Sequence, residues 1–217
     1  MSGPEIKAES NSKHVNTSPF LVKNLRTTAP GQSALLLLDV IDLLNKHNIS
    51  YAVIGAFAAS FHGMVRASLD ADAAISARTP KITDGLCRDL RESGLDVQRR
   101  TGGPGDPIAG VINIQDRFHN RVDLLSGIRG VGQETFDRSV ETQFMGSSIK
   151  IAGLEDFIAM KIFAGGPKDI QDIIGILEVS HEKINGSLLK QLTSRYGKEC
   201  AIKLGEVLKQ YPFLSTE

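Results

Sequence analysis

The stretch RASLDADAAIS (Arg66–Ser76) places two aspartates one residue apart among alanine, leucine and isoleucine. A short apolar run of this kind predicts a buried strand, and the side chains of a strand alternate between its two faces. Asp70 and Asp72 therefore project from one face, and Ala71 and Ala73 project from the other. Two carboxylates ~4 Å apart repel each other by about 4 kcal/mol at the effective dielectric constant of a protein surface.

A third aspartate suggests how this repulsion is offset. Asp123 lies in NRVDLLS (120–126), where valine and leucine flank it, so it also occupies a strand-like apolar context. Hard divalent cations bind carboxylate oxygens, and two cations ~3.5–4 Å apart share such a cluster. The three aspartates are therefore candidate metal ligands. The alternative is that Asp70 caps the start of the strand and Asp72 faces water, which is the commoner meaning of an isolated Asp-x-Asp pair.

Helices and strands alternate in the first 126 residues and so predict a mixed α/β sheet flanked by helices, an α+β fold class. The expected helices are 33–46, with Ser33 as N-cap, 56–62 and 80–92; the expected strands are 51–55, 70–76, 95–100, 111–116 and 121–126. After SIKIA (148–152) the pattern becomes helical, with segments 154–164, 167–177, 187–196 and 198–210. We expect a polar N-terminal tail (1–30), a sheet domain (31–150) and a helical C-terminal subdomain (151–217).

Composition narrows the classes of protein. Lys and Arg together number 25, as do Asp and Glu, so no overall basic field favours nucleic acid, although local patches remain possible. The two cysteines are too few for a disulfide framework. The longest apolar run, ALLLLDVIDLL (34–44), contains two aspartates and is too short to span a bilayer. With a polar N-terminus that lacks a signal-like apolar segment, these features favour a cytoplasmic protein with no membrane partner.

The residues before the Asp-x-Asp pair predict a phosphate site. The strand 51–55 ends at Gly55, Ala56 opens a helix, and thirteen residues (57–69) then precede Asp70. A turn of small residues at a helix N-terminus lets backbone N–H groups approach a phosphate, and the helix dipole also favours an anion there.

In this arrangement the sequence resembles the nucleotidyltransferase superfamily, the DNA polymerase β-like fold. The pattern IGAFAASFHGMVRASLDADAAIS (54–76) is similar to the G-G-x-A…H-G…R-x-S-x-D-x-D form of minimal bacterial nucleotidyltransferases and AbiEii-like toxins. The resemblance covers 51–126 and implies that Asp70, Asp72 and Asp123 bind two Mg²⁺ ions, or Mn²⁺ in their place. It also implies that 31–150 is the catalytic domain. Gly55, Ala56, Arg66 and Ser68 fall on the motif's nucleotide- and phosphate-binding positions.

The helical half adds a second similarity, in GLEDFIAMKIFAGGPKDIQDIIGIL (153–177). A K…K-D-x-x-D pattern is similar to the motif that follows the third acid in AbiEii-type proteins. The resemblance implies that Lys161 and Lys168 contact phosphate and that Asp169 or Asp172 lies near the ribose, base or acceptor. From the residues alone, Lys161 either extends to solvent or serves a buried anion. Asp169 would then complement the helix dipole, and Lys168 would form a surface pair with Asp172.

The sequence departs from the family at two places. Ala56 stands where glycine or serine is usual, which removes a hydroxyl but keeps a small residue. Ala73 and Ala74 stand where bulkier apolar residues are usual, which affects the packing of the strand and leaves the three acids in place.

Other charged residues can be interpreted as functional or as structural. Arg66 either neutralises a triphosphate or forms a structural salt bridge, and His62 more often closes a helix than acts in catalysis. A mobile hairpin loop is the expectation for TGGPGDPIAG (101–110), at the border of the cleft. Arg99, Arg100 and Arg121 either bind a polyanionic acceptor such as tRNA or are solvated strand-edge charges, and His119 is expected in a loop.

Two functions follow, and they belong to different classes. The first is transfer of a nucleoside monophosphate from an NTP to a hydroxyl of tRNA, protein or a small molecule, with release of pyrophosphate. The toxin resemblance adds a separate antitoxin protein as an expected partner. The second is a nucleotide-binding module without turnover that acts through a protein partner. A metal-dependent phosphohydrolase is a third and weaker alternative.

Overall fold

The computed structural model describes residues 25–76 and 80–211. Its seven strands form one mixed sheet in the order β3-β4-β5-β2-β1-β7-β6. The strands are β1 (Tyr51–Ile54), β2 (Asp70–Ile75), β3 (Asp96–Thr101), β4 (Ile108–Gln115), β5 (Arg121–Ile128), β6 (Val140–Phe144) and β7 (Ser147–Ile151). This mixed sheet with flanking helices confirms the predicted fold class.

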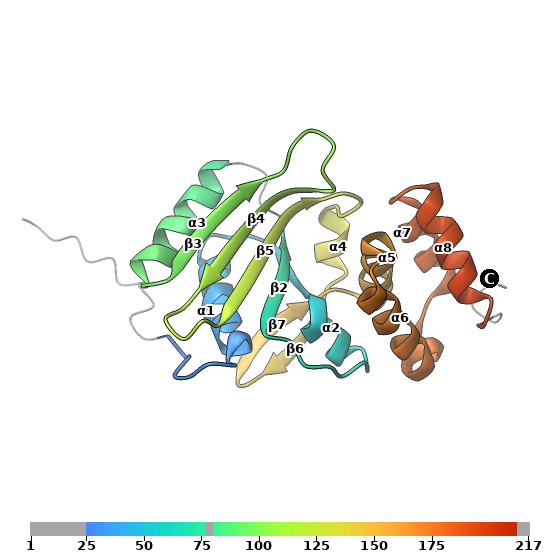
Figure 1. Ribbon diagram of the computed structural model, residues 1–217, viewed down its shortest axis with the longest axis horizontal. Coiled ribbons are helices and arrows are strands. Elements are labelled where there is room, and N and C mark those ends of the chain that lie inside the picture. Colours follow the sequence, from blue (N-terminus) through green and yellow to red (C-terminus); the bar gives the residue numbers. More distant parts are fainter. Residues whose placement is uncertain (1–24, 77–79, 212–217) are drawn as a thin grey trace, which may run out of the picture.

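The helices lie on both sides of the sheet and in a separate group beside it (Figure 1). They are α1 (Ser33–Lys46), α2 (Gly55–Phe61), α3 (Pro80–Glu92), α4 (Gln133–Asp137), α5 (Leu154–Ala164), α6 (Pro167–Ser180), α7 (Gly186–Ser194) and α8 (Lys198–Leu208), with a 3₁₀ turn at His181–Lys183. Helices α1 and α3 pack on the β2–β5 and β3 part of the sheet. Helices α5–α8 pack mainly against one another, and α5 borders the opposite face of the sheet.

The alternation of side chains explains which face the helices α1 and α3 cover. Ala71, Ala73, Val122 and Leu124 expose 3 % or less of their surface and pack into the core, whereas the residues between them are only partly buried. Burying these apolar side chains stabilises β2 and β5. It also turns the aspartates of both strands toward the other face.

Ser33 has a different role from the predicted one. Gln32 is the N-cap residue of α1, and Ser33 caps nothing. Its hydroxyl instead donates to the carbonyl oxygen of Leu69 at 2.6 Å and accepts from the backbone N–H of Arg121 at 3.0 Å. Leu69 directly precedes β2 and Arg121 begins β5, so Ser33 joins the backbone where the two strands begin.

Several predicted boundaries agree with the structure. The bounds of α1, α3 and α5 are those expected, and Asn48 and Gly94, the predicted stops, have φ angles of +53° and +85°. Helix α6 runs three residues further than expected. The short helix α4 and the edge strand β6 were not predicted, because five residues are too few to show a clear apolar period.

Most of the predicted tail, residues 1–24, lies outside the described residues. Within the remainder, Arg26 forms ion pairs with Asp39 at 2.6 Å and Asp42 at 2.8 Å, so α1 holds this part of the chain. The two acids that interrupt the longest apolar run thus share one cation. The division of the chain at residues 30 and 150 stays a prediction.

Two further features of the described residues concern cysteine and membranes. Cys87 and Cys200 are free and buried. Among residues 25–76 and 80–211, no helix combines the length and the apolar character that crossing a membrane requires.

We expect Ser33→Ala to lower the free energy of unfolding by about 1–3 kcal/mol, because the Leu69 carbonyl and the Arg121 N–H both lose the hydroxyl of buried Ser33 as their partner. Ser60→Ala is the matched control, since the Ser60 hydroxyl bonds only the Ala56 carbonyl within its own helix. Urea denaturation measures both variants. Equal losses in the two variants would contradict a special role for Ser33.

Candidate active site

The three predicted acids lie together at the start of β2 and β5. Asp72 and Asp123 are register partners in these parallel strands, and Asp70 is the partner of Arg121. Neighbouring strands lie ~4.8 Å apart, and residues in register project from the same face. The carboxylates of Asp72 and Asp123 are therefore neighbours, with Asp70 two residues along on the same face.

Each outer carboxylate of the cluster has a polar neighbour that holds it. The hydroxyl of Ser68 donates to Asp70 Oδ1 at 2.6 Å, and Asn113 Nδ2 donates to Asp123 Oδ1 at 2.8 Å. Arg121 Nη2 lies 3.9 Å from Asp123 Oδ2. These contacts leave carboxylate oxygens of both residues available for another ligand.

Asp72 occupies the centre of the cluster. Burial, together with the charges of Asp70 and Asp123, raises the pKa of its carboxyl group to about 6, although Lys161 and Arg66 act in the opposite direction. The three carboxylates thus act on one another across the two strands. A cation placed among them would relieve this repulsion.

Gly55 brings the backbone of α2 against Asp72. Its φ angle is +66°, a left-handed conformation, and a Cβ atom at this position would lie 2.1 Å from Asp72 Oδ2. Only glycine combines this conformation with such close approach. The predicted turn therefore abuts the central carboxylate, and Ala56 lies buried next to it.

Asp172 joins two of the predicted cationic residues. Its carboxylate accepts from Arg66 Nε at 2.8 Å and Nη2 at 3.3 Å, and it lies 2.8 Å from Lys161 Nζ. Lys161 also donates to Asp169 Oδ1 at 2.7 Å. Because only 1 % of the Asp172 side chain is exposed, this carboxylate lies between the two cations and away from solvent.

The remaining predicted site residues have different surroundings. Lys168 is exposed in the first turn of α6, and Asp172 is not its surface partner as the simpler reading expected, because Asp172 is buried. Asp169 Oδ2 accepts from the N–H of Gly166 at 3.0 Å and so caps the start of α6. For Arg66, the structure shows the salt bridge.

His62 and His119 have the structural positions that the sequence predicted, at the end of a helix and in a loop. His62 is the C-cap residue of α2, and its Nε2 lies 2.9 Å from the carbonyl oxygen of Ala152. His119 lies in the turn between β4 and β5, where its Nδ1 contacts Gln115 Nε2 at 2.9 Å.

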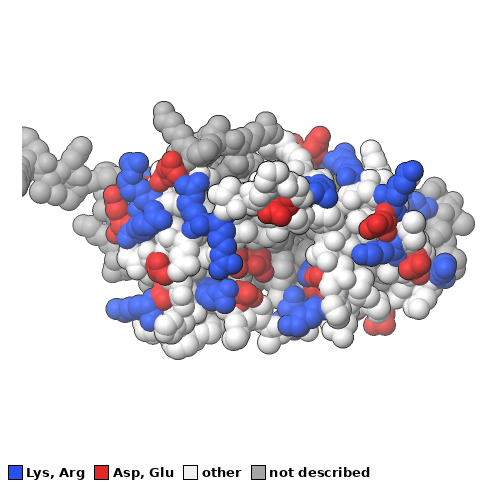
Figure 2. All heavy atoms as spheres, turned by 45° about the horizontal axis from the view of Figure 1, so that its top comes forward, with Lys and Arg blue, Asp and Glu red and all other residues white. Residues whose placement is uncertain are grey.

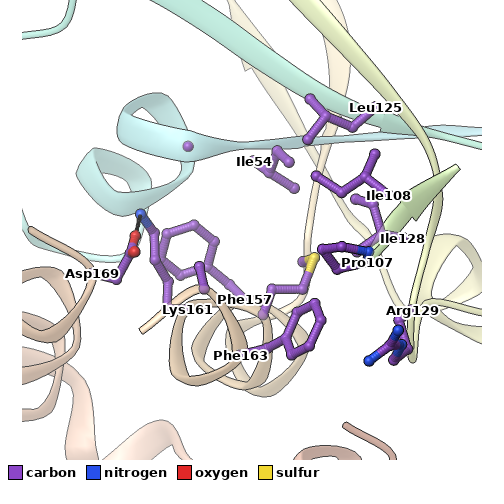
Figure 3. Close-up of a pocket in the computed structure, with 13 residues that line it drawn as sticks. Ile54, Pro107, Ile108, Leu125, Ile128, Arg129, Phe157, Lys161, Phe163 and Asp169 are labelled. Atoms are coloured by element: carbon purple, nitrogen blue, oxygen red, sulfur yellow. Dashed lines mark hydrogen bonds and ion pairs between the residues drawn. The ribbon is translucent and has the colours of Figure 1, made fainter. Parts of the chain in front are cut away.

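An apolar pocket of about 470 Å³ opens between the sheet and α5, next to Gly55 (Figure 3). Phe157, Met160 and Phe163 line it from α5, and Ile54 and Leu125 line it from the sheet. Lys161 and Asp169 stand together at one side of the pocket and Arg129 stands at the other. Pro107 from the predicted border loop also lines the wall, as does Ile108, which the sequence placed in that loop but which is the first residue of β4. The pocket thus combines a mainly apolar wall with a few charged groups at its edges, as ligand sites commonly do.

The donor set fits a hard divalent cation. Within the described ranges 25–76 and 80–211, no group of three or more His, Cys, Asp or Glu side chains is arranged to hold a metal ion. Mg²⁺ does not require such a group, because it is usually bound by one or two carboxylates and completed by water and substrate phosphate oxygens. The adjacent carboxylates of Asp72 and Asp123 provide oxygen ligands of this kind.

Asn113 is a site residue that the sequence analysis missed. It lies between buried Ile112 and Ile114 in β4 and is the register partner of Asp123. The alternation in VINIQ indicates that Asn113 faces the polar side of the sheet. That it lies beside Asp123 follows from the β4–β5 register, which the sequence alone did not reveal.

Comparison with known proteins identifies the fold. No family model and no curated protein matches the chain. Among solved structures, ANT(2'')-Ia in complex with adenylyl-2''-tobramycin is 15 % identical with a TM-score of 0.54, and the match covers 76 % of this chain and 99 % of that one. A nucleotidyltransferase-like protein from Paracoccidioides brasiliensis is 20 % identical with a TM-score of 0.51, covering 88 % and 94 % of the two chains.

The chain therefore has the same fold as these two structures. At 15 % and 20 % identity the likeness concerns the fold alone, and the fold that the sequence resemblance implied is confirmed. These structures do not address a particular closeness to AbiEii-like toxins, which stays a prediction.

The raised pKa of Asp72 predicts a pH-dependent stability. Between about pH 4, the range of a free aspartate, and about pH 6, the folded protein binds more protons than the unfolded chain, so the contribution of this group to stability falls as the pH rises. Asp72→Asn, which resembles the protonated form, should raise the melting temperature at pH 8 and change it little at pH 4.

Thermal denaturation in EDTA at both pH values measures this effect without bound cations. The control is Asp137→Asn, a change of an exposed aspartate on α4. A stabilisation by Asp72→Asn that is the same at both pH values would contradict the assignment.

The close approach of Gly55 predicts a large effect of a single methyl group. Gly55→Ala should lower the melting temperature and also weaken nucleotide binding, because the new Cβ displaces the Asp72 carboxylate. Gly31→Ala is the matched control: its φ angle is +79°, and no atom lies within 4 Å of the added Cβ. Both variants bear a strain of about 1–2 kcal/mol from the left-handed backbone, so a difference between them isolates the contact with Asp72. Thermal denaturation and calorimetric titration with Mg-ATP make the comparison, and equal effects would contradict it.

Proposed function

We propose that the protein is a metal-dependent nucleotidyltransferase that moves a nucleoside monophosphate from an NTP to a hydroxyl acceptor and releases pyrophosphate. The observation that carries this proposal is the in-register pairing of Asp72 with Asp123, next to the turn at Gly55. Metal ligands, a close backbone approach and a ligand-sized pocket meet at this point.

The NTP occupies the side of the site formed by Gly55 and Lys161. In this proposal the apolar pocket holds the nucleoside, and its phosphates extend toward the carboxylates past Gly55 and Ala56. Lys161 binds phosphate, and Asp169, which also lines the pocket, contacts the ribose or base. Lys168 is exposed in the first turn of the same helix as Asp169 and adds positive charge to the entrance.

Asp172, Arg66 and Ser68 act by positioning. Asp172 is fully buried, so it orients Lys161 and Arg66 instead of contacting the nucleotide. Ser68 holds the carboxylate of Asp70 through its hydroxyl. A positioning role of this kind keeps charged groups in the geometry that phosphoryl transfer requires.

Asp70, Asp72 and Asp123 would hold Mg²⁺, or Mn²⁺ in its place. The bound ions supply charge neutralisation at the phosphate oxygens. The acceptor oxygen forms a bond to the α-phosphorus, and the bond from that phosphorus to the bridging oxygen breaks, so that pyrophosphate leaves with the electron pair. Asp123, which Asn113 orients, takes the proton of the acceptor hydroxyl.

The comparisons support transfer of this general kind. The ANT(2'')-Ia structure is a complex with adenylyl-2''-tobramycin, a molecule that carries an adenylyl group. The acceptor of the present chain is tRNA, a protein or a small molecule. A role as an AbiEii-like toxin with an antitoxin partner is part of the proposal that rests on the sequence resemblance.

The experiment incubates the protein with each α-labelled NTP, Mg²⁺ and representatives of the three acceptor classes. We expect label transfer with pyrophosphate release, and a loss of about 10²-fold or more in Asp72→Asn and in Asp123→Asn. Asp137→Asn should retain full activity.

Other products would favour the other functions. Nucleotide binding by calorimetry with no transfer to any acceptor supports the binding module. Release of inorganic phosphate in place of pyrophosphate supports a phosphohydrolase.

A further inference from the structure

A second pocket, of about 440 Å³, lies on the open face of β3, β4 and β5. Its side chains form rows across the three strands. Asp123 is the register partner of Asn113, which is the partner of Gln98, and Arg121 is the partner of Gln115. Asp123 belongs to both the acid cluster and this pocket, so the pocket begins where the reaction would take place.

The lining of this second pocket differs from that of the apolar pocket. Amide groups of Gln98, Asn113 and Gln115 and the guanidinium groups of Arg100 and Arg121 make it strongly polar. Figure 2 shows Lys and Arg side chains in a band next to an acidic group near the centre of this face. An apolar ring would gain little here, whereas a ligand with hydroxyl groups and an oxyanion would find partners.

The guanidinium groups of Arg100 and Arg121 are both able to bind a ligand. Among the described residues, Arg100 forms no ion pair, and Arg121 approaches a carboxylate only at 3.9 Å, with 53 % of its side chain exposed. A guanidinium group binds phosphate oxygens in a bidentate manner. One exposed carboxylate, Asp96, also lies in the pocket, and the charge of Asp123 would be neutralised by bound cations. The occupied site therefore presents a net positive field.

Arg99, the neighbour of Arg100 in β3, shows that an arginine reaches the pocket only from one face of the strand. Arg99 lies on the opposite side of β3, where its guanidinium pairs with Asp84 and donates to the hydroxyl of Thr83 at 3.1 Å. Its charge is thus directed toward α3. Of the three arginines that the sequence singled out, only Arg100 and Arg121 line the pocket.

We propose that this polar pocket binds the acceptor and that the acceptor carries a phosphate group close to its reacting hydroxyl. The inference rests on the proposed nucleotidyl transfer and specifies its substrate class. The phosphate binds between Arg100 and Arg121, the hydroxyl reaches Asp123, and the amide side chains bind neighbouring sugar hydroxyls. Polycationic acceptors are disfavoured by the same field. An RNA 3′ end and a free sugar phosphate share this chemistry.

The transfer experiment compares four acceptors with labelled NTP and Mg²⁺: a short single-stranded RNA with a free 3′ hydroxyl, ribose 5-phosphate, ribose and tobramycin. We expect labelling of the RNA or of ribose 5-phosphate at least tenfold above ribose and tobramycin. The preferred member of the first pair identifies the source of the phosphate. Equal or better labelling of ribose or tobramycin would overturn the proposal.

The variants Arg100→Gln and Arg99→Gln test the assigned residue with a matched neighbour. Arg100→Gln should raise the KM for the phosphate-bearing acceptor about tenfold, the loss of one charge-assisted contact, and leave the KM for NTP unchanged. Arg99→Gln should leave both values unchanged. Identical behaviour of the two variants would contradict a direct role for Arg100.

A binding measurement separates this proposal from the proposed function. Fluorescence anisotropy of a labelled RNA, with ribose 5-phosphate as competitor, reports on the pocket without turnover. We expect Arg100→Gln to weaken binding of the RNA, or competition by the sugar phosphate, about tenfold while Arg99→Gln does not. Such a result without nucleotidyl transfer would reject the proposed reaction and retain the site, and absence of both binding and competition would reject the site.

Discussion

The parallel pairing of β2 with β5 is the constraint on which the site depends. Ser33 joins the backbone where both strands begin, and the buried alanine, valine and leucine side chains hold one face of each strand against α1. If the pairing of β2 with β5 shifted by one residue, these apolar side chains would turn to the open face of the sheet. The register is therefore strongly specified. The repulsion between Asp72 and Asp123 is therefore imposed by the packing of the opposite face, and the site keeps its negative charge without a ligand.

Two close contacts connect this charge to the rest of the molecule. Gly55 brings the start of α2 against Asp72, and buried Asp172 holds Arg66 and Lys161 on the side of α6. A buried carboxylate that lost both cations would be left with an uncompensated charge, which is strongly unfavourable. The helical half is thus fixed to the loop before β2 by electrostatics as well as by its own core. Lys161 and Arg66 lie near enough to lower the pKa of Asp72.

Local patterns in the sequence were sufficient for most elements and for the acid cluster. Alternation placed Asp70 and Asp72 on one face, and glycines marked the ends of α2 and α3, because these signals depend only on neighbouring residues. Strand order and long-range partners were not accessible in this way. The position of Asn113 beside Asp123 depends on the β4–β5 register, and the partner of Arg66 is 106 residues away. The edge strand β6 has little apolar pattern because its side chains are exposed or only partly buried.

The same alternation that separates Asp72 from Ala73 also separates Arg99 from Arg100. In both strands, one face is covered by helices and its polar groups must find partners within the protein, as Arg99 does with Asp84. The other face stays open, and its polar groups keep their capacity for a ligand. An apolar pocket next to Gly55 and a polar pocket beyond Asp123 consequently flank one acid cluster. A stacked nucleoside suits the first pocket and a charged, hydroxylated molecule suits the second. The reacting groups of two such molecules would meet at the carboxylates between them.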